Sequence, residues 1–181
     1  MYKPAVADRG DDSQGVVLLL DEIDKADTTV TQALWQAVTL GNSSRFKGDK
    51  LPVETVNWHD IQDFIAWLNQ RYPKLQSRLP WEAEWGYACR AGSQTSFNFE
   101  GKLTTDKVNY NYSYSPYWGK ETTEIKSYPC NVWGLYDMHG NVWEWCQDSW
   151  QRHLGEETVC DPWLEQQPLG SDSCRVARGG T

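Results

Sequence analysis

The feature that most constrains the fold is a long segment, residues 93–181, in which no helical periodicity survives. The segment is rich in Asn, Gly, Tyr, Trp and Ser, with short strand-like pieces around Val132, residues 142–145 and residues 175–177. About ninety residues of mostly irregular chain are unusual inside a compact domain, where connections are usually short. We therefore expect bound metal and tryptophan packing, rather than long ladders, to hold this part of the chain.

Length and composition favour one domain with a bulky aromatic core. The chain has 181 residues, and its 11 Trp, 9 Tyr and 4 Phe supply large areas to bury. The net charge of −8 argues against a nucleic-acid or membrane partner, because both require a basic face. The only early apolar run, residues 16–20, is too short for a signal peptide or a membrane span, so a cytoplasmic location is expected.

The cysteines are odd in number, widely spaced and without a CxxC pair, and they are Cys89, Cys130, Cys146, Cys160 and Cys174. This pattern favours reduced thiols over a disulfide framework. A pair between Cys160 and Cys174 stays open, because sequence positions alone do not give a distance. A zinc site of Cys130, His139 and Cys146 has suitable ligand types, but it lacks the paired spacing of such sites and is not favoured.

Three helices are predicted in the first half of the chain. Apolar residues recur at 3- and 4-residue spacing over residues 31–39 and 58–69, and a third helix is expected from Pro80 onward. Gly41 and Gly92 are the expected stops of the first and third helices, because glycine readily takes the left-handed conformation that ends a helix. All three helices are expected to form scaffold rather than site.

The helix starts carry recognisable signals. Asn57 is a capping residue with Asp60 three positions on, a weaker form of the capping box. Pro80 suits the first position of a helix because its missing N–H is not needed there. Glu82 and Glu84 favour the same helix end through its dipole.

Six blocks of sequence occur in an order typical of one family. They are VTQALWQAV (residues 30–38), NSSRFKG (42–48), LPVETVNW (51–58), RLP-EAEW-CRAG (78–92), GLYDMHGNVWEW (134–145) and RVARGG (175–180). Together they resemble the formylglycine-generating enzyme family, also called sulfatase-modifying factors, over residues 28–181. The resemblance implies an α+β protein with a variant C-type lectin fold, low in regular secondary structure, with about three helices and short antiparallel strands. It also implies that the domain ends before the C-terminal segment of the family.

The resemblance also implies a calcium site in the loop of residues 137–144. Its ligands would be the side chains of Asp137 and Glu144 and the backbone carbonyls of Gly140 and Val142. Carboxylates and carbonyls are the hard oxygen donors that calcium prefers. The alternative is structural, with Asp137 in a surface turn and Glu144 as the exposed member of an alternating Trp-Glu-Trp strand.

Two departures from the family pattern bear on the site and the scaffold. A second family ion would lie near Asn109 and Tyr110, but the sequence ETTE at residues 121–124 replaces the stretch that supplies a further acid, so that site is doubtful. Trp81 stands where the family usually has a Ser or Thr that caps the third helix, and losing such a cap costs about 1 kcal/mol.

The family uses this domain in a copper-dependent oxidase that converts a sulfatase cysteine to formylglycine, in iron-dependent sulfoxide synthases, and in variable ligand-binding proteins of diversity-generating retroelements. The copper-binding cysteine pair of the oxidase matches positions beyond Thr181, so copper is expected only if a further segment supplies it. The iron-ligating histidines of the synthases belong to another domain. We therefore expect a non-catalytic module that binds a protein or a small molecule; the alternative is a fragment of the oxidase.

Residues 1–27 are expected to form a separate acidic leader before the domain of residues 28–181. Within it, VLLLDEIDKA at residues 17–26 resembles the Walker-B strand of an AAA+ ATPase of the MoxR type. In such a strand Asp21 would hold Mg²⁺ and Glu22 would polarise the attacking water. No GxxxxGK[ST] loop occurs in the sequence, so ATPase activity is not expected. The alternative is that this run is the first strand of the lectin-like domain.

Overall fold

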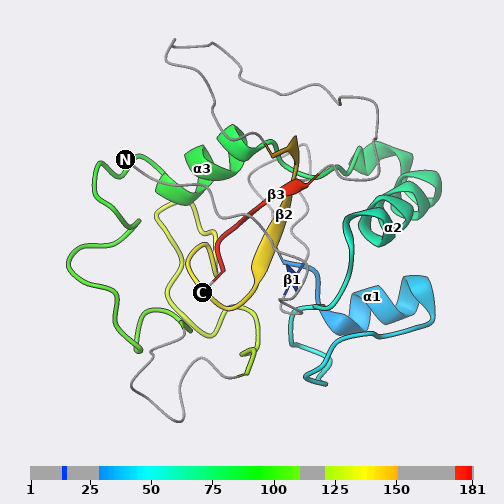
Figure 1. Cartoon of the computed structure of the whole chain (residues 1–181), viewed down its shortest axis with the longest axis horizontal. Coiled ribbons are helices and arrows are strands. Elements are labelled where there is room, and N and C mark those ends of the chain that lie inside the picture. The colour runs from blue at the N-terminus through cyan, green and yellow to red at the C-terminus, as the bar shows by residue number, and fades with distance from the viewer. Residues whose placement is uncertain (1–13, 16–28, 111–120, 151–173, 181) are drawn as a thin grey trace.

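The computed structural model describes residues 14–15, 29–110, 121–150 and 174–180. In these residues three α-helices surround a small sheet, and long irregular segments connect them (Figure 1). The predicted apolar run at residues 16–20 and the question of a bond between Cys160 and Cys174 involve residues outside this description. None of the described helices combines the length and apolarity that a membrane crossing requires.

The first helix, α1 (Gln32–Thr39), begins and ends close to the predicted residues. The Thr31 side chain accepts a hydrogen bond from the N–H of Leu34, which caps the first turn. The helix ends at Leu40, whose φ of 61° is left-handed and whose N–H donates to the carbonyl of Gln36. The stop therefore lies one residue before the predicted Gly41.

The second helix, α2 (Trp58–Arg71), has the predicted capping box. The Oδ1 atom of Asn57 accepts from the N–H groups of His59 and Asp60, and the Asp60 carboxylate accepts from the N–H of Asn57 at 3.0 Å. This exchange satisfies three backbone donors that a helix start leaves without partners. A short 3₁₀ helix, η2 (Pro73–Leu75), follows directly.

The third helix, α3 (Glu82–Arg90), begins later than predicted. Pro80 is not its first residue, because the carbonyl of Pro80 accepts a hydrogen bond from the N–H of Gln147 in the sheet at 2.8 Å. Trp81 is still extended, with φ −69° and ψ 152°. The helix ends at Ala91, which takes the left-handed conformation one residue before the predicted Gly92.

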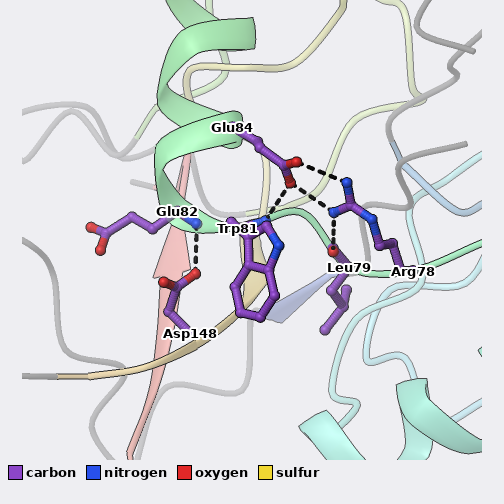
Figure 2. Close-up of polar contacts among 6 residues, drawn as sticks. All are labelled: Arg78, Leu79, Trp81, Glu82, Glu84 and Asp148. Carbon is purple, nitrogen blue, oxygen red and sulfur yellow. Dashed lines mark hydrogen bonds and ion pairs between the residues drawn. The ribbon is translucent and has the colours of Figure 1, made fainter. Parts of the chain in front are cut away.

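A strand supplies the cap that Trp81 cannot give to α3 (Figure 2). The Asp148 carboxylate accepts from the N–H of Glu82 at 2.6 Å, and the Glu84 carboxylate accepts from the N–H of Trp81 at 2.8 Å. Arg78 holds Glu84 in place with two hydrogen bonds of 2.7 and 2.8 Å. The cost expected from the Trp81 departure is therefore offset by a carboxylate from another element.

The sheet has the strand order β1-β2-β3. The strand β2 (Trp143–Ser149) pairs antiparallel with β3 (Arg175–Arg178), and β1 (Gln14–Gly15) pairs parallel with the start of β2. Two of the predicted strand-like pieces are therefore strands. The prediction of a strand around Val132 is wrong, because Val132 lies in a turn with its side chain exposed.

Alternation along the strands divides the core between the two faces of the sheet. Trp145 and Ala177 belong to the apolar cluster that contains α1 and α2, whereas Cys146 and Val176 belong to the cluster that contains α3. We call these two sides the α1–α2 face and the α3 face. Because successive side chains of a strand point to opposite faces, Glu144 lies on the α3 face, beside Trp85. The predicted α+β class, with three helices and a short antiparallel pair, is confirmed.

Candidate functional site

The loop that precedes β2 is tightly folded. Asp137, Gly140 and Asn141 all have positive φ, of 56°, 87° and 64°. No residue with a side chain fits at position 140, because a Cβ atom there would lie 2.2 Å from the carbonyl oxygen of Asn109. The N–H of Gly140 donates to the carbonyl of Gly179 at 2.6 Å, and the N–H of Asn141 donates to that of Asn109 at 2.8 Å. The loop is therefore held between two distant segments.

Glu144 is fully buried in the structure, with 0 % of its surface exposed. Its Oε2 atom accepts from the indole N–H of Trp85 at 2.6 Å, and its Oε1 atom accepts from the hydroxyl of Thr29 at 3.4 Å. The alternative interpretation of Glu144 as an exposed strand residue is therefore wrong. Asp137 is also buried, with 8 % exposed, so it is not a surface turn residue either.

The two acids, Asp137 and Glu144, share one buried region, where no described residue gives either of them a cationic partner. Burial raises the pKa of Asp137, and hydrogen bonds from the Lys126 N–H and the Asn141 side chain oppose that rise. Burial raises the pKa of Glu144 well above its usual range, the Trp85 bond opposes this, and the nearby Asp137 charge raises it further. Neither acid forms an ion pair with any residue that the structure describes.

The predicted calcium ligands fit a hard cation in their donor chemistry. Asp137, Gly140, Val142 and Glu144 lie in one loop, and two carboxylates with two carbonyl oxygens match the ligands that calcium prefers. The carbonyl of Gly140 also accepts from the N–H of Val142 at 2.9 Å, which uses one of its two lone pairs. Two buried negative charges balance one divalent cation.

Among the residues described, no three His, Cys, Asp or Glu side chains gather as a metal site. An ion in the loop of residues 137–144 would therefore depend on backbone oxygens as well as on its two carboxylates. The same finding excludes the disfavoured zinc set. Cys130 is exposed, whereas Cys146 is buried in the α3 face.

Three asparagines organise the neighbouring loops, and of these only Asn109 was named in the sequence analysis, at the doubtful second ion. Asn141 exchanges two hydrogen bonds with the backbone of Thr123, at 3.0 and 3.1 Å, and Asn109 donates to the carbonyl of Glu121 at 2.9 Å. Asn131 donates to the carbonyl of Ala88 at 2.8 Å. The sequence feature that could have indicated this role is the high asparagine content of a segment without periodicity, because Asn side chains readily form hydrogen bonds with backbone groups.

A cavity of about 570 Å³ opens beside this loop, on the α3 face. Trp85, Leu103, Val108 and Met138 give it apolar walls, and Arg90 stands among its polar lining residues. Its volume lies within the range of roughly 300–1,000 Å³ found for small-molecule sites.

Cys89 and His139 lie together in the wall of this cavity, but they do not form an activated pair. The Sγ and Nε2 atoms are 3.7 Å apart, and the same Nε2 atom accepts from the N–H of Asn98 at 3.2 Å. Burial lowers the pKa of His139 to about 4 and raises the pKa of Cys89 to about 12. Burial also raises the pKa of Cys146 well above its usual range. At neutral pH the imidazole of His139 is therefore uncharged and the two thiols are protonated. A protonated thiol is a poor nucleophile and a poor copper ligand.

The fold and the buried acidic loop define a lectin-like α+β domain of the formylglycine-generating type. The sequence profile of the sulfatase-modifying factor enzyme 1-like domain matches residues 3–181. The chain therefore belongs to this family. Because the match begins at residue 3, it includes the apolar run at residues 16–20. The domain boundary after residue 27 and the ATPase-like origin of that run stay predictions.

Curated relatives share the domain within longer proteins. The chain is 32 % identical to the formylglycine-generating enzyme of Bos taurus over 143 residues, which is 72 % of this chain and 34 % of that protein. It is 35 % identical to the serine/threonine-protein kinase Pkn1 of Chlamydia trachomatis over 133 residues, 72 % of this chain and 19 % of the kinase. The chain thus spans about a third or less of the length of these relatives.

Solved structures match over most of the chain. Treponema denticola variable protein 1 aligns with a TM-score of 0.63 and 26 % identity, over 98 % of this chain and 80 % of its own. PvdO from Pseudomonas aeruginosa aligns with the same TM-score of 0.63 and 26 % identity, over 83 % of this chain and 78 % of its own. The scaffold is therefore one that proteins with different names share.

Proposed function

We propose that this chain is a non-catalytic module that binds a protein or small-molecule ligand on a calcium-stabilised scaffold. The observation that carries the proposal is the charge balance of the loop. Asp137 and Glu144 are buried, and neither has a cationic partner among the described residues. Burying two such charges without compensation is costly, and a divalent cation would remove the cost.

Calcium suits this site better than magnesium. Irregular loops with carboxylates and backbone carbonyls accommodate the variable coordination of calcium, whereas magnesium demands near-ideal octahedral geometry. Three residues of the loop have positive φ, which directs the backbone in a way that a regular turn or strand would not. Asp137 and Glu144 would supply the charge, and the carbonyls of Gly140 and Val142 would supply further oxygens.

The buried thiols favour a binding role over the oxidase alternative. The oxidase chemistry requires two thiolates that bind soft Cu(I). Cys89 and Cys146 are buried with raised pKa values, and so they remain protonated at neutral pH. The alignment with variable protein 1 over 98 % of this chain supports the same choice. A cytoplasmic location and the absence of nucleic-acid and membrane partners stay predictions.

Isothermal titration calorimetry with CaCl₂ tests the scaffold part of the proposal. We expect one saturable site in the wild-type protein, and its loss in Asp137→Asn, which keeps the shape of the side chain and removes its charge. Glu124→Gln is the matched control, because Glu124 is an exposed acid that pairs only loosely with Lys50, at 3.9 Å. Calcium binding that survives Asp137→Asn would remove the site from this loop.

An oxidase assay tests the non-catalytic part. The protein, supplied with Cu(I) and oxygen, is incubated with a cysteine peptide of sulfatase type, and mass spectrometry follows the conversion of cysteine to formylglycine. The proposal expects no turnover above that of free copper. Turnover would establish the oxidase alternative and end the non-catalytic proposal.

A further inference from the structure

A glycine in the middle of α3 faces open space. Gly86 lies in the centre of a helix that spans Glu82–Arg90, and glycine is among the least favourable residues for a helix interior. A glycine inside a helix can let a neighbouring segment pack closely against it. Here a Cβ atom added to Gly86 would meet nothing within 4 Å. Gly86 instead lines the cavity of about 570 Å³, so its missing side chain leaves room in that cavity.

Every charged side chain that lines the cavity in the described part of the chain is positive. The lining includes Arg90 and Arg178 and no acidic side chain among the described residues, although the whole chain carries a net charge of −8. Arg178 is already paired with Glu82. Arg90 is exposed and makes no side-chain hydrogen bond or ion pair with any described residue. As far as the described part of the chain goes, the Arg90 guanidinium is therefore available to an anion at the cavity.

The rest of the wall is apolar or uncharged. Trp85, Phe97, Leu103 and Met138 contribute hydrophobic surface, and His139 is neutral at physiological pH because burial lowers its pKa to about 4. Among the residues that the structure describes, the chamber is apolar with one cation that has no hydrogen-bond or ion-pair partner, and such a site favours a ligand with an apolar body and one negative group.

We propose that this cavity binds a small organic anion, whose aromatic or branched apolar body fills the chamber and whose carboxylate or sulfonate pairs with Arg90. The inference rests on the proposed function, since it names the ligand class of the binding module. It does not depend on calcium, because only Gly140 of the four proposed calcium-ligand residues lines the cavity.

Two fluorescent probes of almost the same shape test the charge recognition. 8-Anilinonaphthalene-1-sulfonate carries a negative group, and N-phenyl-1-naphthylamine is its neutral counterpart. We expect both to bind the full chain saturably, at one site. Arg90→Gln should weaken the anionic probe about tenfold, as expected for a lost hydrogen bond to a charged group, and leave the neutral probe within about twofold. Equal weakening of both probes, or no binding of the anionic probe, would overturn the proposal.

Two substitutions at Gly86 test the location. Gly86→Ala adds one methyl group and should leave both probes bound, whereas Gly86→Leu places a four-carbon side chain in the chamber and should weaken both probes to a similar degree. Because nothing lies within 4 Å of the added Cβ, both variants should fold, which circular dichroism and thermal unfolding check. Unchanged binding in Gly86→Leu would place the probe elsewhere. An unfolded Gly86→Leu beside a stable Gly86→Ala would mean that the chain itself occupies the space, and either result overturns the inference.

The failure of this inference can be separated from the failure of the proposed function. If the protein does not bind calcium or turns over the cysteine peptide while the probes follow the expected pattern, the cavity assignment stands and the proposed function falls. If calcium binds and no turnover occurs while the probes fail, the reverse holds.

Discussion

The two faces of the sheet are stabilised in different ways. On the α1–α2 face the cluster is apolar, as in the stack of Trp35 on Phe64 with ring centroids 4.8 Å apart. The buried acid beside it, Glu54, accepts hydrogen bonds from the Phe46 N–H and the Thr55 hydroxyl. On the α3 face a smaller apolar cluster lies beside buried acids, a neutral histidine and an open cavity. One face resembles an ordinary core, whereas the other combines buried acids with empty space, an arrangement that a bound ion or ligand would make more favourable.

The same strand serves both faces, which links stability to the site. Trp145 of β2 packs with α1 and α2 and donates from its indole N–H to the carbonyl of Val56 at 3.2 Å. Its neighbour Glu144 points to the α3 face and accepts from Trp85. A rigid core on one side thus positions the carboxylate on the other, and the supporting residues need no contact with a ligand.

The largest effect is expected on the apolar face. Phe64→Ala should lower the free energy of unfolding by about 3–5 kcal/mol, because the side chain is 1 % exposed and its removal leaves a cavity against Trp35. Urea denaturation measures the loss, and we expect it to be the same in CaCl₂ and in EGTA. Asp63→Ala, at an exposed position of the same helix, is the control and should change stability by less than about 0.5 kcal/mol. A calcium-dependent loss in Phe64→Ala would break the distinction between the faces.

A smaller but still large effect is expected in the loops of the α3 face, where hydrogen bonds replace apolar contacts. Asn131 accepts from the N–H groups of Trp133 and Leu135 and donates to the carbonyl of Ala88. Asn131→Ala should cost about 2–3 kcal/mol, because it leaves buried backbone groups without partners. Val132→Ala removes a side chain that is 82 % exposed and should cost little. Equal costs in the two variants would show that polar bonding does not hold this region.

The cap of α3 gives a pH-dependent effect of intermediate size. Desolvation raises the pKa of Glu84, but hydrogen bonds from Arg78 and from the Trp81 N–H outweigh it, so this pKa lies below its ordinary value of 4.5. The ionised side chain therefore stabilises the fold above pH 4.5, and the contribution is lost as the pH falls through the lowered pKa. Glu84→Gln should cost about 1 kcal/mol at neutral pH and progressively less in acid. Denaturant unfolding at several pH values measures this, and a cost that does not shrink in acid would contradict it.

The smallest effect is expected at the end of α1. Leu40 is 89 % exposed and has a left-handed φ of 61°, a conformation that is strained for a residue with a Cβ atom. Leu40→Gly should raise the free energy of unfolding by about 0.5–1 kcal/mol, since relief of strain exceeds the added freedom of the unfolded chain. Leu40→Ala keeps the strain and should differ little from wild type in the same thermal unfolding experiment. A matching gain in Leu40→Ala would assign the effect to the exposed side chain instead.

Local signals in the sequence predicted the α1–α2 face well. The periodicity and the Asn57 capping box placed α2 correctly, because these signals act within a few residues. The start of α3 was predicted too early, since its cap comes from Asp148, 66 residues away. A local sequence pattern cannot predict a capping partner that lies so far away in the chain.

The loop of the candidate site was predicted from the family resemblance, whereas the burial of its acids and the cavity beside it were found only in the structure. Alternation in Trp-Glu-Trp reads as a strand with one exposed face, but this sheet is covered on both faces, so Glu144 is buried. The cavity was not predicted, because Gly86 and Arg90 of α3 meet Met138 of a distant loop only in the folded chain.

The central claim is that the α3 face holds buried acids for a bound cation, and thermal unfolding of wild type and Glu144→Gln in CaCl₂ and in EGTA tests it most directly. The variant keeps an acceptor for Trp85 and removes the buried charge. The account predicts that calcium raises the wild-type midpoint with concentration, that the variant shows no calcium response, and that in EGTA the variant is at least as stable as wild type. A wild-type midpoint that ignores calcium, or an equal calcium shift in Glu144→Gln, would contradict it.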